Sequence, residues 1–304
     1  MTESIAAIQN FGYLGESLAL VSAFIWAVAI ILFRISGKTV HPVGLNFFKN
    51  FLALILFTIT ILVINKSFFP KAPWESYTLL LFSGVLGMGL SDTLFFAALN
   101  RLGAGLSAIV NCTYSPFVII LSTIFIAEKM SPIQLLGVVF IVSAVLTISQ
   151  KKLHKHISTK DLITGIYLGI SAMLVQAVSI VMIKPLLNNS PLLWATQVRT
   201  AGGLVFLCLV LFFHPKRLAI WKDMFPQKTW VYMGTGTFLG SYIGLACWMG
   251  GMKFTQASVA SALNQTNTIF VFILGMIILK EEATKGKFLA LFLAILGVLL
   301  VTFL

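Results

Sequence analysis

The stretch SALNQTNTIFVFILG (residues 261–275) places five consecutive polar residues, 264–268, between apolar runs that have the composition of a membrane-spanning helix. Polar groups at bilayer depth lack water as a hydrogen-bond partner, so they usually face other helices or a wet cavity. In a helix, Ser261, Asn264, Gln265 and Thr268 would form one stripe along a single face. The stretch therefore predicts a polar helix face inside an otherwise apolar protein.

The rest of the chain also has the composition of a membrane protein. Of its 304 residues, 59% are hydrophobic and only 10% are charged, and the mean hydropathy is +0.99. A soluble domain carries about 25% charged residues, and a spanning helix needs about 20 mainly apolar ones. The apolar runs predict ten spans, at 17–35, 43–64, 77–99, 104–127, 132–149, 162–183, 192–213, 230–250, 257–279 and 286–304. The predicted fold class is therefore all-α integral membrane.

An internal repeat relates the two halves of the chain. The segment ALNRLGAGLSAIVNCTYSPF (98–117) matches GGMKFTQASVASALNQTNTIF (250–270), and AEKMS (127–131) matches KEEAT (280–284), at an offset of about 152 residues. We therefore predict two copies of a five-helix unit, residues 1–150 and 151–304. Because five is odd, the second copy enters the membrane from the opposite side, which gives two inverted repeats. Inverted repeats are typical of carriers that bind substrate near the midplane, at the repeat interface.

The duplicated five-helix pattern, the helix that carries TYSPF and the turn AEKMS together resemble the EamA-type transporters of the drug/metabolite transporter superfamily. The resemblance covers roughly residues 18–304. It implies a ten-helix secondary transporter in the bacterial cytoplasmic (inner) membrane, as a multi-pass protein. Members of the family move amino acids, nucleobase-like compounds or other metabolites, often outward, so the resemblance implies a class of function and no particular substrate.

The second copy departs from the pattern of the first in two places. Asn267 and Thr268 stand where the first copy has Ser115 and Pro116, and Glu282 stands where the first copy has the basic Lys129. We therefore expect no role in the second half that depends on this proline kink or on this basic residue.

Two matched polar clusters predict a substrate cavity between the fourth and ninth spans. They lie roughly 10 to 18 Å from the start of their helices, near the middle of a ~30 Å hydrocarbon core. The alternative is that they only form interhelical hydrogen bonds that support packing. Their symmetry favours a cavity, with Trp26 and two tyrosines as apolar walls. The predicted substrate-binding residues are Trp26, Asn111, Tyr114, Ser115, Gln176, Arg199, Tyr242, Asn264, Gln265 and Thr268.

Three ionisable residues fall at the same depth as these clusters. Lys49 and Asp92 can be coplanar with Asn111, and two interpretations of them stay open. They form a structural ion pair, or Asp92 couples transport to protons. Arg199 is the repeat mate of Lys49 but has no acidic mate. It would hold a substrate carboxylate or phosphate through its planar donor fork, or else extend to the membrane interface.

Glycines in two spans predict close helix packing. Gly236, Gly240 and Gly244 follow one another at intervals of four and allow a neighbouring helix to approach closely. Gly84, Gly87 and Gly89 have the same effect in the third span.

The function predicted is secondary transport, by a proton- or exchange-driven carrier. The rival is a non-catalytic membrane subunit or lipid-interaction protein whose polar helix faces pack against partners. No enzyme motif occurs, the three cysteines are far apart, and we predict neither cofactor nor metal. The expected partners are a small-molecule substrate, the lipid bilayer and protons, with no nucleic acid, and the chain acts as a monomer or homodimer. Fourteen Lys and Arg on one side against five on the other place the termini outside the cytoplasm, whereas the resemblance implies both inside.

Overall fold

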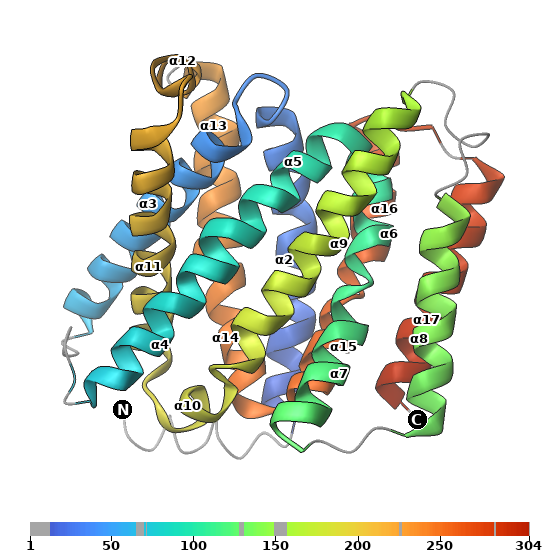
Figure 1. The fold of residues 1–304 in the computed structure, drawn as a ribbon, viewed down its shortest axis with the longest axis horizontal. Helices are drawn as coiled ribbons and strands as arrows, with labels where there is room; N and C mark the ends of the chain where they lie inside the picture. The colour runs from blue at the N-terminus through green and yellow to red at the C-terminus, as the bar shows by residue number, and fades with distance from the viewer. Residues whose placement is uncertain are drawn as a thin grey trace.

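The computed structural model describes residues 13–64, 70, 72–127, 131–148, 157–224, 227–282 and 284–303. Every regular element in these residues is a helix, which confirms the all-helical prediction (Figure 1). Among them, six helices are long and apolar enough to cross a membrane: Leu14–Ser36, Pro42–Val63, Trp74–Leu102, Ala104–Phe125, Thr159–Val181 and Leu192–Phe213. Two shorter apolar helices are Pro132–Thr147 and Asn267–Ile278. By this criterion the described residues contain fewer spans than the ten predicted.

The two halves of the chain repeat one order of elements. The first half contains α2 (Leu14–Ser36), α3 (Pro42–Val63), α4 (Trp74–Gly84), the π-helical segment η1 (Val85–Ser91), α5 (Asp92–Leu102), α6 (Ala104–Asn111), α7 (Tyr114–Phe125) and α8 (Pro132–Ile148). The second contains α9 (Thr159–Val181), α10 (Lys184–Asn189), α11 (Leu192–Phe213), α12 (Arg217–Asp223), α13 (Gln227–Gly236), the π-helical segment η3 (Thr237–Gly244), α14 (Leu245–Phe254), α15 (Ala257–Asn264), α16 (Asn267–Ile278) and α17 (Lys285–Phe303). The short helices α10 and α12 are additions, at opposite ends of the molecule in Figure 1.

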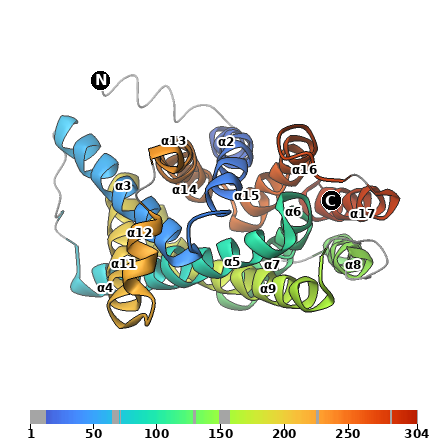
Figure 2. The same cartoon turned by 90° about the horizontal axis from the view of Figure 1, so that it is seen from above.

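The halves interleave, and each covers part of the other. Helix α2 packs against α13, η3, α14, α15 and α16 of the second half, and α9 packs against η1, α5, α6 and α7 of the first. Figure 2 shows α3 with α11 at one end of the molecule and α8 with α17 at the other. The first helix of each repeat thus completes the core of the other repeat, and the centre of the molecule belongs to both.

Two helices at this centre are each divided into two segments, α6–α7 and α15–α16, and they run in opposite directions. Helix α6 contacts α16, and α7 contacts α15, so the first segment of one pair lies beside the second segment of the other (Figure 1). This antiparallel arrangement is what inversion of the second copy requires.

The π-helical segments change the register between the repeats. Segment η1 has seven residues and η3 has eight. The offset is therefore 152 from Gly84 to Gly236, before these segments, and 153 from Asp92 to Leu245, after them. Beyond this point the pairing of Asn267 and Thr268 with Ser115 and Pro116 was therefore wrong by one residue. Tyr114 corresponds to Asn267, and Ser115, not Pro116, corresponds to Thr268.

Side chains from neighbouring helices bind the carbonyl groups of the π segments. Asn46 of α3 donates to the carbonyls of Met88 and Gly89 at 2.9 and 3.0 Å, and Asn50 donates to Met88 at 3.2 Å. In the second repeat, the indole of Trp26 donates to the carbonyl of Gly240 at 2.8 Å. A π-helical turn is otherwise unfavourable, and such turns are frequent at functional sites. These contacts stabilise the π-helical conformation of η1 and η3 beside the centre of the molecule.

The predicted spans 104–127 and 257–279 are not continuous helices. The break at Cys112 and Thr113 agrees with Pro116, whose missing N–H releases a carbonyl one turn earlier. The second break, at Gln265 and Thr266, occurs without a proline. A threonine follows each helix segment: Thr113 donates through its hydroxyl to Val110, and Thr266 to Leu263, both at 2.8 Å. The two threonines thus make the same side-chain hydrogen bond at each break, with or without a proline.

Glycines allow α2 to approach η3 closely, as predicted. A Cβ added at Gly244 would lie 2.8 Å from Cδ1 of Trp26, and one added at Gly236 would lie 3.1 Å from the ring of Phe33. Any side chain at these positions would push α2 away and displace Trp26.

Glu281 joins the end of the second repeat to the start of α6. Its carboxylate oxygens accept hydrogen bonds from the backbone N–H groups of Ala104 at 2.6 Å and Gly105 at 2.9 Å. Gly103, just before α6, has a φ of 82° and leaves room for this carboxylate. A negative charge at a helix N-terminus is favourable, because the exposed N–H groups carry a partial positive charge. Lys129, in the equivalent turn of the first copy, lies outside the described residues.

We expect Glu281→Gln to lower the free energy of unfolding by about 1–3 kcal/mol, since hydrogen bonds to charged groups contribute about 1.5–3 kcal/mol each and the amide retains one acceptor oxygen. Thermal or denaturant unfolding of the protein in detergent measures this change. The matched control is Glu282→Gln at the adjacent exposed position, for which we expect about 0.5 kcal/mol or less. Equal effects at both positions would contradict the helix-capping role of Glu281.

Candidate functional site: a polar cavity between the repeats

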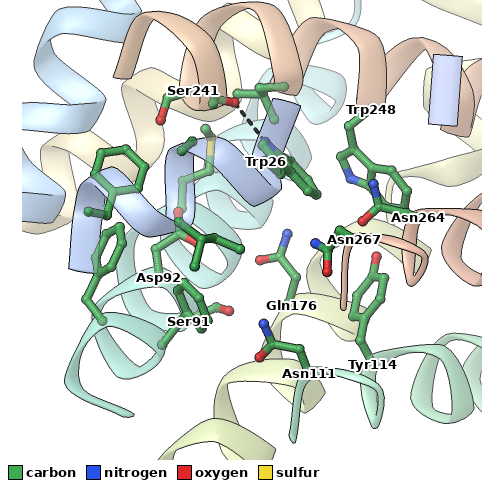
Figure 3. A pocket seen from close by; sticks show the side chains of 18 of the residues that line it. Trp26, Ser91, Asp92, Asn111, Tyr114, Gln176, Ser241, Trp248, Asn264 and Asn267 are labelled. Atoms are coloured by element: carbon green, nitrogen blue, oxygen red, sulfur yellow. Dashed lines mark hydrogen bonds between the residues drawn. The ribbon is translucent and has the colours of Figure 1, made fainter. Parts of the chain in front are cut away.

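A cavity of about 160 Å³ lies at the centre of the molecule, where the two repeats meet (Figure 3). The first repeat lines it with residues of α2, α3, η1, α5, α6 and α7, and the second with residues of α9, α11, η3, α14, α15 and α16. Both π-helical segments and both helix breaks reach its wall. Parts of the structure that depart from regular α-helix thus contribute to the wall, beside residues of regular helices.

The helix breaks direct polar side chains into the cavity. Asn111 ends α6 and Tyr114 begins α7, while Asn264 ends α15 and Asn267 begins α16. Figure 3 shows these four side chains around a common space, together with the amide of Gln176. Backbone that leaves the α-helix at membrane depth is tolerated where it is buried in protein or lines a water-filled cavity.

Aromatic rings form much of the remaining wall. The rings of Trp26 and Trp248 lie 5.5 Å apart, and that of Tyr114 lies 6.1 Å from Trp248. Towards the ion pair described below, Phe33 and Phe96 meet edge to face at 5.3 Å. The rings give the cavity flat apolar surfaces beside its polar groups.

Six polar atoms on this wall are buried and have no hydrogen-bond partner among the described residues. They are Asn111 Oδ1, Tyr114 Oη, Gln176 Oε1, Arg199 Nε, Trp248 Nε1 and Asn267 Oδ1. A buried polar atom without a partner costs about 1–3 kcal/mol. Native structures retain few such atoms, and a group of six in one cavity indicates that a ligand or water normally occupies it.

Lys49 and Asp92 form an ion pair on one side of the cavity. The side chain of Lys49 is 8% exposed and that of Asp92 27%. The ammonium also lies 5.6 Å from the centre of the Phe96 ring, a cation–π contact. Asp92 follows η1 directly, so the π-helical segment sets the direction in which its carboxylate points.

Arg199 of α11 reaches the cavity from the second repeat and is 2% exposed. Its guanidinium donates to the sulfur of Met249 at 2.9 Å and to the hydroxyl of Ser179 at 3.4 Å. Both acceptors are uncharged. Gly87 of η1 leaves the space for this group, because a Cβ there would lie 3.1 Å from the guanidinium.

The family model of EamA-like transporters matches residues 13–150 and 163–303, once in each repeat. The chain belongs to the EamA-like transporter family. It is therefore a multi-pass integral membrane protein with a two-repeat architecture, and its family carries solutes across membranes.

Relatives of this EamA-like protein cover most of its length. A protein of Archaeoglobus fulgidus, described as an uncharacterized transporter, is 23% identical over 93% of this chain and 96% of its own. A second protein with that description, from Clostridium kluyveri, is 23% identical over 70% of this chain and 68% of its own. One solved crystal structure is similar in fold, with a TM-score of 0.71 and 15% identity over 95% of this chain and 96% of its own.

Most of the residues predicted for the site of this EamA-like transporter line the cavity. They are Trp26, Lys49, Asp92, Asn111, Tyr114, Gln176, Arg199, Asn264 and Gln265. Three others lie elsewhere. Ser115 is fully buried beside the break, and Thr268 packs between α16 and α6, where it donates to Ala108 at 3.2 Å. The hydroxyl of Tyr242 pairs with Thr60 of α3, outside the cavity wall.

The sequence did not select several residues of the cavity wall in this EamA-like transporter. Asn267 and Trp248 line the cavity, and each has a buried polar atom without a partner among the described residues, while Ser91 and Ser241 come from the π-helical segments. A repeat alignment at the offset of 153 would have found Asn267, since it corresponds to Tyr114. It would also have found Trp248, which corresponds to Phe95 of the wall.

Proposed function

We propose that this protein is a secondary active transporter, an exporter or exchanger of small metabolites such as amino acids or related compounds. It works by alternating access around the cavity between α6–α7 and α15–α16, coupled to protons or to exchange. Residues 1–150 and 151–304 form inverted repeats of five spans each. The ten spans are α2, α3, α4–η1–α5, α6–α7, α8, α9, α11, α13–η3–α14, α15–α16 and α17. We place the protein in the bacterial cytoplasmic membrane.

One observation carries this proposal: the buried, unpaired polar atoms of the cavity come from both repeats. Asn111 and Tyr114 contribute from one broken helix and Asn267 from the other. Transporter folds with inverted repeats bind substrate at this position, on discontinuous helices near the midplane. The site residues proposed are those that line the cavity, with Lys49 and Asp92 as an ion pair or coupling group.

The arrangement of polar groups also favours transport over the alternatives. A subunit or lipid-interaction protein would direct its polar helix faces outward to partners, whereas Asn111, Gln176 and Asn267 face the interior. Membership of a transporter family likewise favours transport over catalysis.

Transport by the purified protein in liposomes tests the proposal. The panel contains amino acids, amines, nucleobases and carboxylates, each with and without a pH gradient. We expect at least one class to accumulate or exchange. We also expect Asn267→Ala to lower its transport about 5- to 10-fold, because one ligand hydrogen bond contributes about 1 kcal/mol. Stability should hardly change, since Asn267 Oδ1 has no partner in the protein.

The matched control is Ser122→Ala in α7. Ser122 Oγ is also buried and unpaired, but it lies outside the cavity wall. Its removal should leave transport within about 2-fold of the unchanged protein. Failure of every solute to move, with Asn267→Ala and Ser122→Ala behaving alike, would contradict the carrier proposal.

A further inference from the structure

The charges on the cavity wall do not balance. Among the described lining residues, three carry a charge: Lys49, Asp92 and Arg199. Lys49 and Asp92 neutralise each other in their ion pair. The cavity therefore has a net charge of about +1, which belongs to Arg199.

Among the residues that the structure describes, none close to Arg199 offsets its charge. Its contacts are a thioether and a hydroxyl, and its Nε has no partner. Asp92 attracts the guanidinium at longer range, but Lys49 already holds that carboxylate. A guanidinium presents five donors and cannot lose its proton in a protein, so its burial is unfavourable unless an anion pairs with it.

Comparison of the two repeats shows which position of the second repeat has no carboxylate where the first repeat has one. Lys49 and Arg199 are equivalent in α3 and α11, but the residue equivalent to Asp92 is Leu245, which also lines the cavity. The first repeat thus contains its own carboxylate, and the second offers an apolar side chain and cavity space in the same place.

The rest of the wall suits a small organic body. The indoles of Trp26 and Trp248, 5.5 Å apart, form apolar surfaces, and Tyr114 Oη and Trp248 Nε1 are unpaired donors. The volume of about 160 Å³ is close to the ~150 Å³ of an engineered cavity that binds benzene. A cavity of this volume therefore fits a body about the size of one aromatic ring.

We propose that the cavity binds compact organic monoanions, namely monocarboxylates with a body no larger than about one ring, and that Arg199 holds the carboxylate. This inference rests on the proposed carrier function and narrows the metabolites proposed for the same site to those with one net negative charge. A single negative charge neutralises the loaded cavity, whereas a neutral molecule or a cation leaves a buried charge uncompensated.

The first test measures binding by the wild-type protein in detergent. The probes are benzoate, benzamide and benzylamine, and butyrate, butyramide and butylamine, which differ in charge at nearly constant size. Tryptophan fluorescence and the melting temperature report binding. We expect one or both carboxylates to bind at least ~10-fold more tightly than the matched amide and amine. Equal or tighter binding of the amides or amines, or no binding by any probe, overturns the inference.

The second test places a carboxylate inside the protein. Leu245→Asp supplies the counter-ion that Asp92 supplies in the first repeat, and Leu245→Asn is the control of equal size without the charge. We expect Leu245→Asp to weaken carboxylate binding at least ~10-fold relative to Leu245→Asn. Equal carboxylate affinity in the two variants contradicts the role of Arg199. If Leu245→Asp does not fold, the wild-type panel still decides.

Transport of the same six probes in liposomes, taken as the rate above that of protein-free liposomes, separates this inference from the proposed function. If the amides or amines move and the carboxylates do not, the carrier function stands and the monoanion inference is wrong. If the carboxylates bind selectively but no probe or metabolite crosses the membrane, the ligand assignment stands and the carrier function is wrong.

Discussion

Changing Asp92 to asparagine is expected to lower the free energy of unfolding by about 3–5 kcal/mol, because removal of one partner of a buried ion pair leaves the other charge uncompensated. The side chain of Lys49 is 8% exposed, and its ammonium also contacts the Phe96 ring. Unfolding of the purified protein in detergent measures the change. A loss below about 1 kcal/mol would show that the pair is as weak as an exposed one.

The double variant Lys49→Met/Asp92→Leu is the matched control. It removes both charges and keeps the volume of the pair, so it should be more stable than Asp92→Asn alone. If the double variant is no more stable than the single one, the pairing energy is not the cause. Transport by the double variant also separates the two roles of the pair. If the pair is only structural, transport by the double variant should keep the pH dependence of the unchanged protein. If Asp92 couples transport to protons, that pH dependence should be lost.

Gly84→Ala is expected to destabilise the protein by about 3 kcal/mol, the upper part of the range for overpacked cores. A Cβ at Gly84 would overlap the carbonyl oxygen of Arg199 and lie 2.7 Å from its carbonyl carbon. These atoms are backbone, so α11 as a whole must move away from α4. The shift would also displace the Arg199 side chain, so we expect ligand binding to fall together with stability.

The control is Gly234→Ala in α13. A Cβ at Gly234 meets nothing within 4 Å, and alanine is favoured over glycine inside a helix by up to about 1 kcal/mol. This variant should therefore be slightly more stable than the wild type. Similar destabilisation by both alanines would mean that the contact of α4 with α11 is looser than the structure shows. Melting temperatures of the two variants, measured side by side, make the comparison.

Much of the fold followed from hydrophobic runs and the internal repeat, because both are properties of the sequence alone. The helix segments could be predicted, but the π-helical interruptions depend on contacts between distant residues. The π-helical segment η1 is held by Asn46 and Asn50, and η3 by Trp26, all from other helices. No sequence pattern near residue 88 or 240 predicts these contacts.

In the candidate site, too, some residues could be predicted from the sequence and others required the structure. Asn111, Asn264 and Gln265 could be found because polar groups in matched apolar helices need partners. Ser115 and Thr268 were selected on the assumption of continuous helices, but neither lines the cavity beside the breaks. Tyr242 lies in η3, where the π-helical geometry directs it to Thr60. The direction of a side chain beyond an irregular turn requires the structure.

The central claim is that the cavity between the repeats opens to each side of the membrane in turn. Accessibility of a cysteine at Ser241 tests it most directly, because Ser241 lines the cavity and is 7% exposed. Cys112, Cys208 and Cys247 are first replaced by alanine, and Ser122→Cys, outside the wall, serves as the control. We expect a membrane-impermeant maleimide to label Ser241→Cys from either side of sealed vesicles, and a transported solute to protect it. Labelling from one side alone, or labelling that no transported solute reduces, would contradict the account.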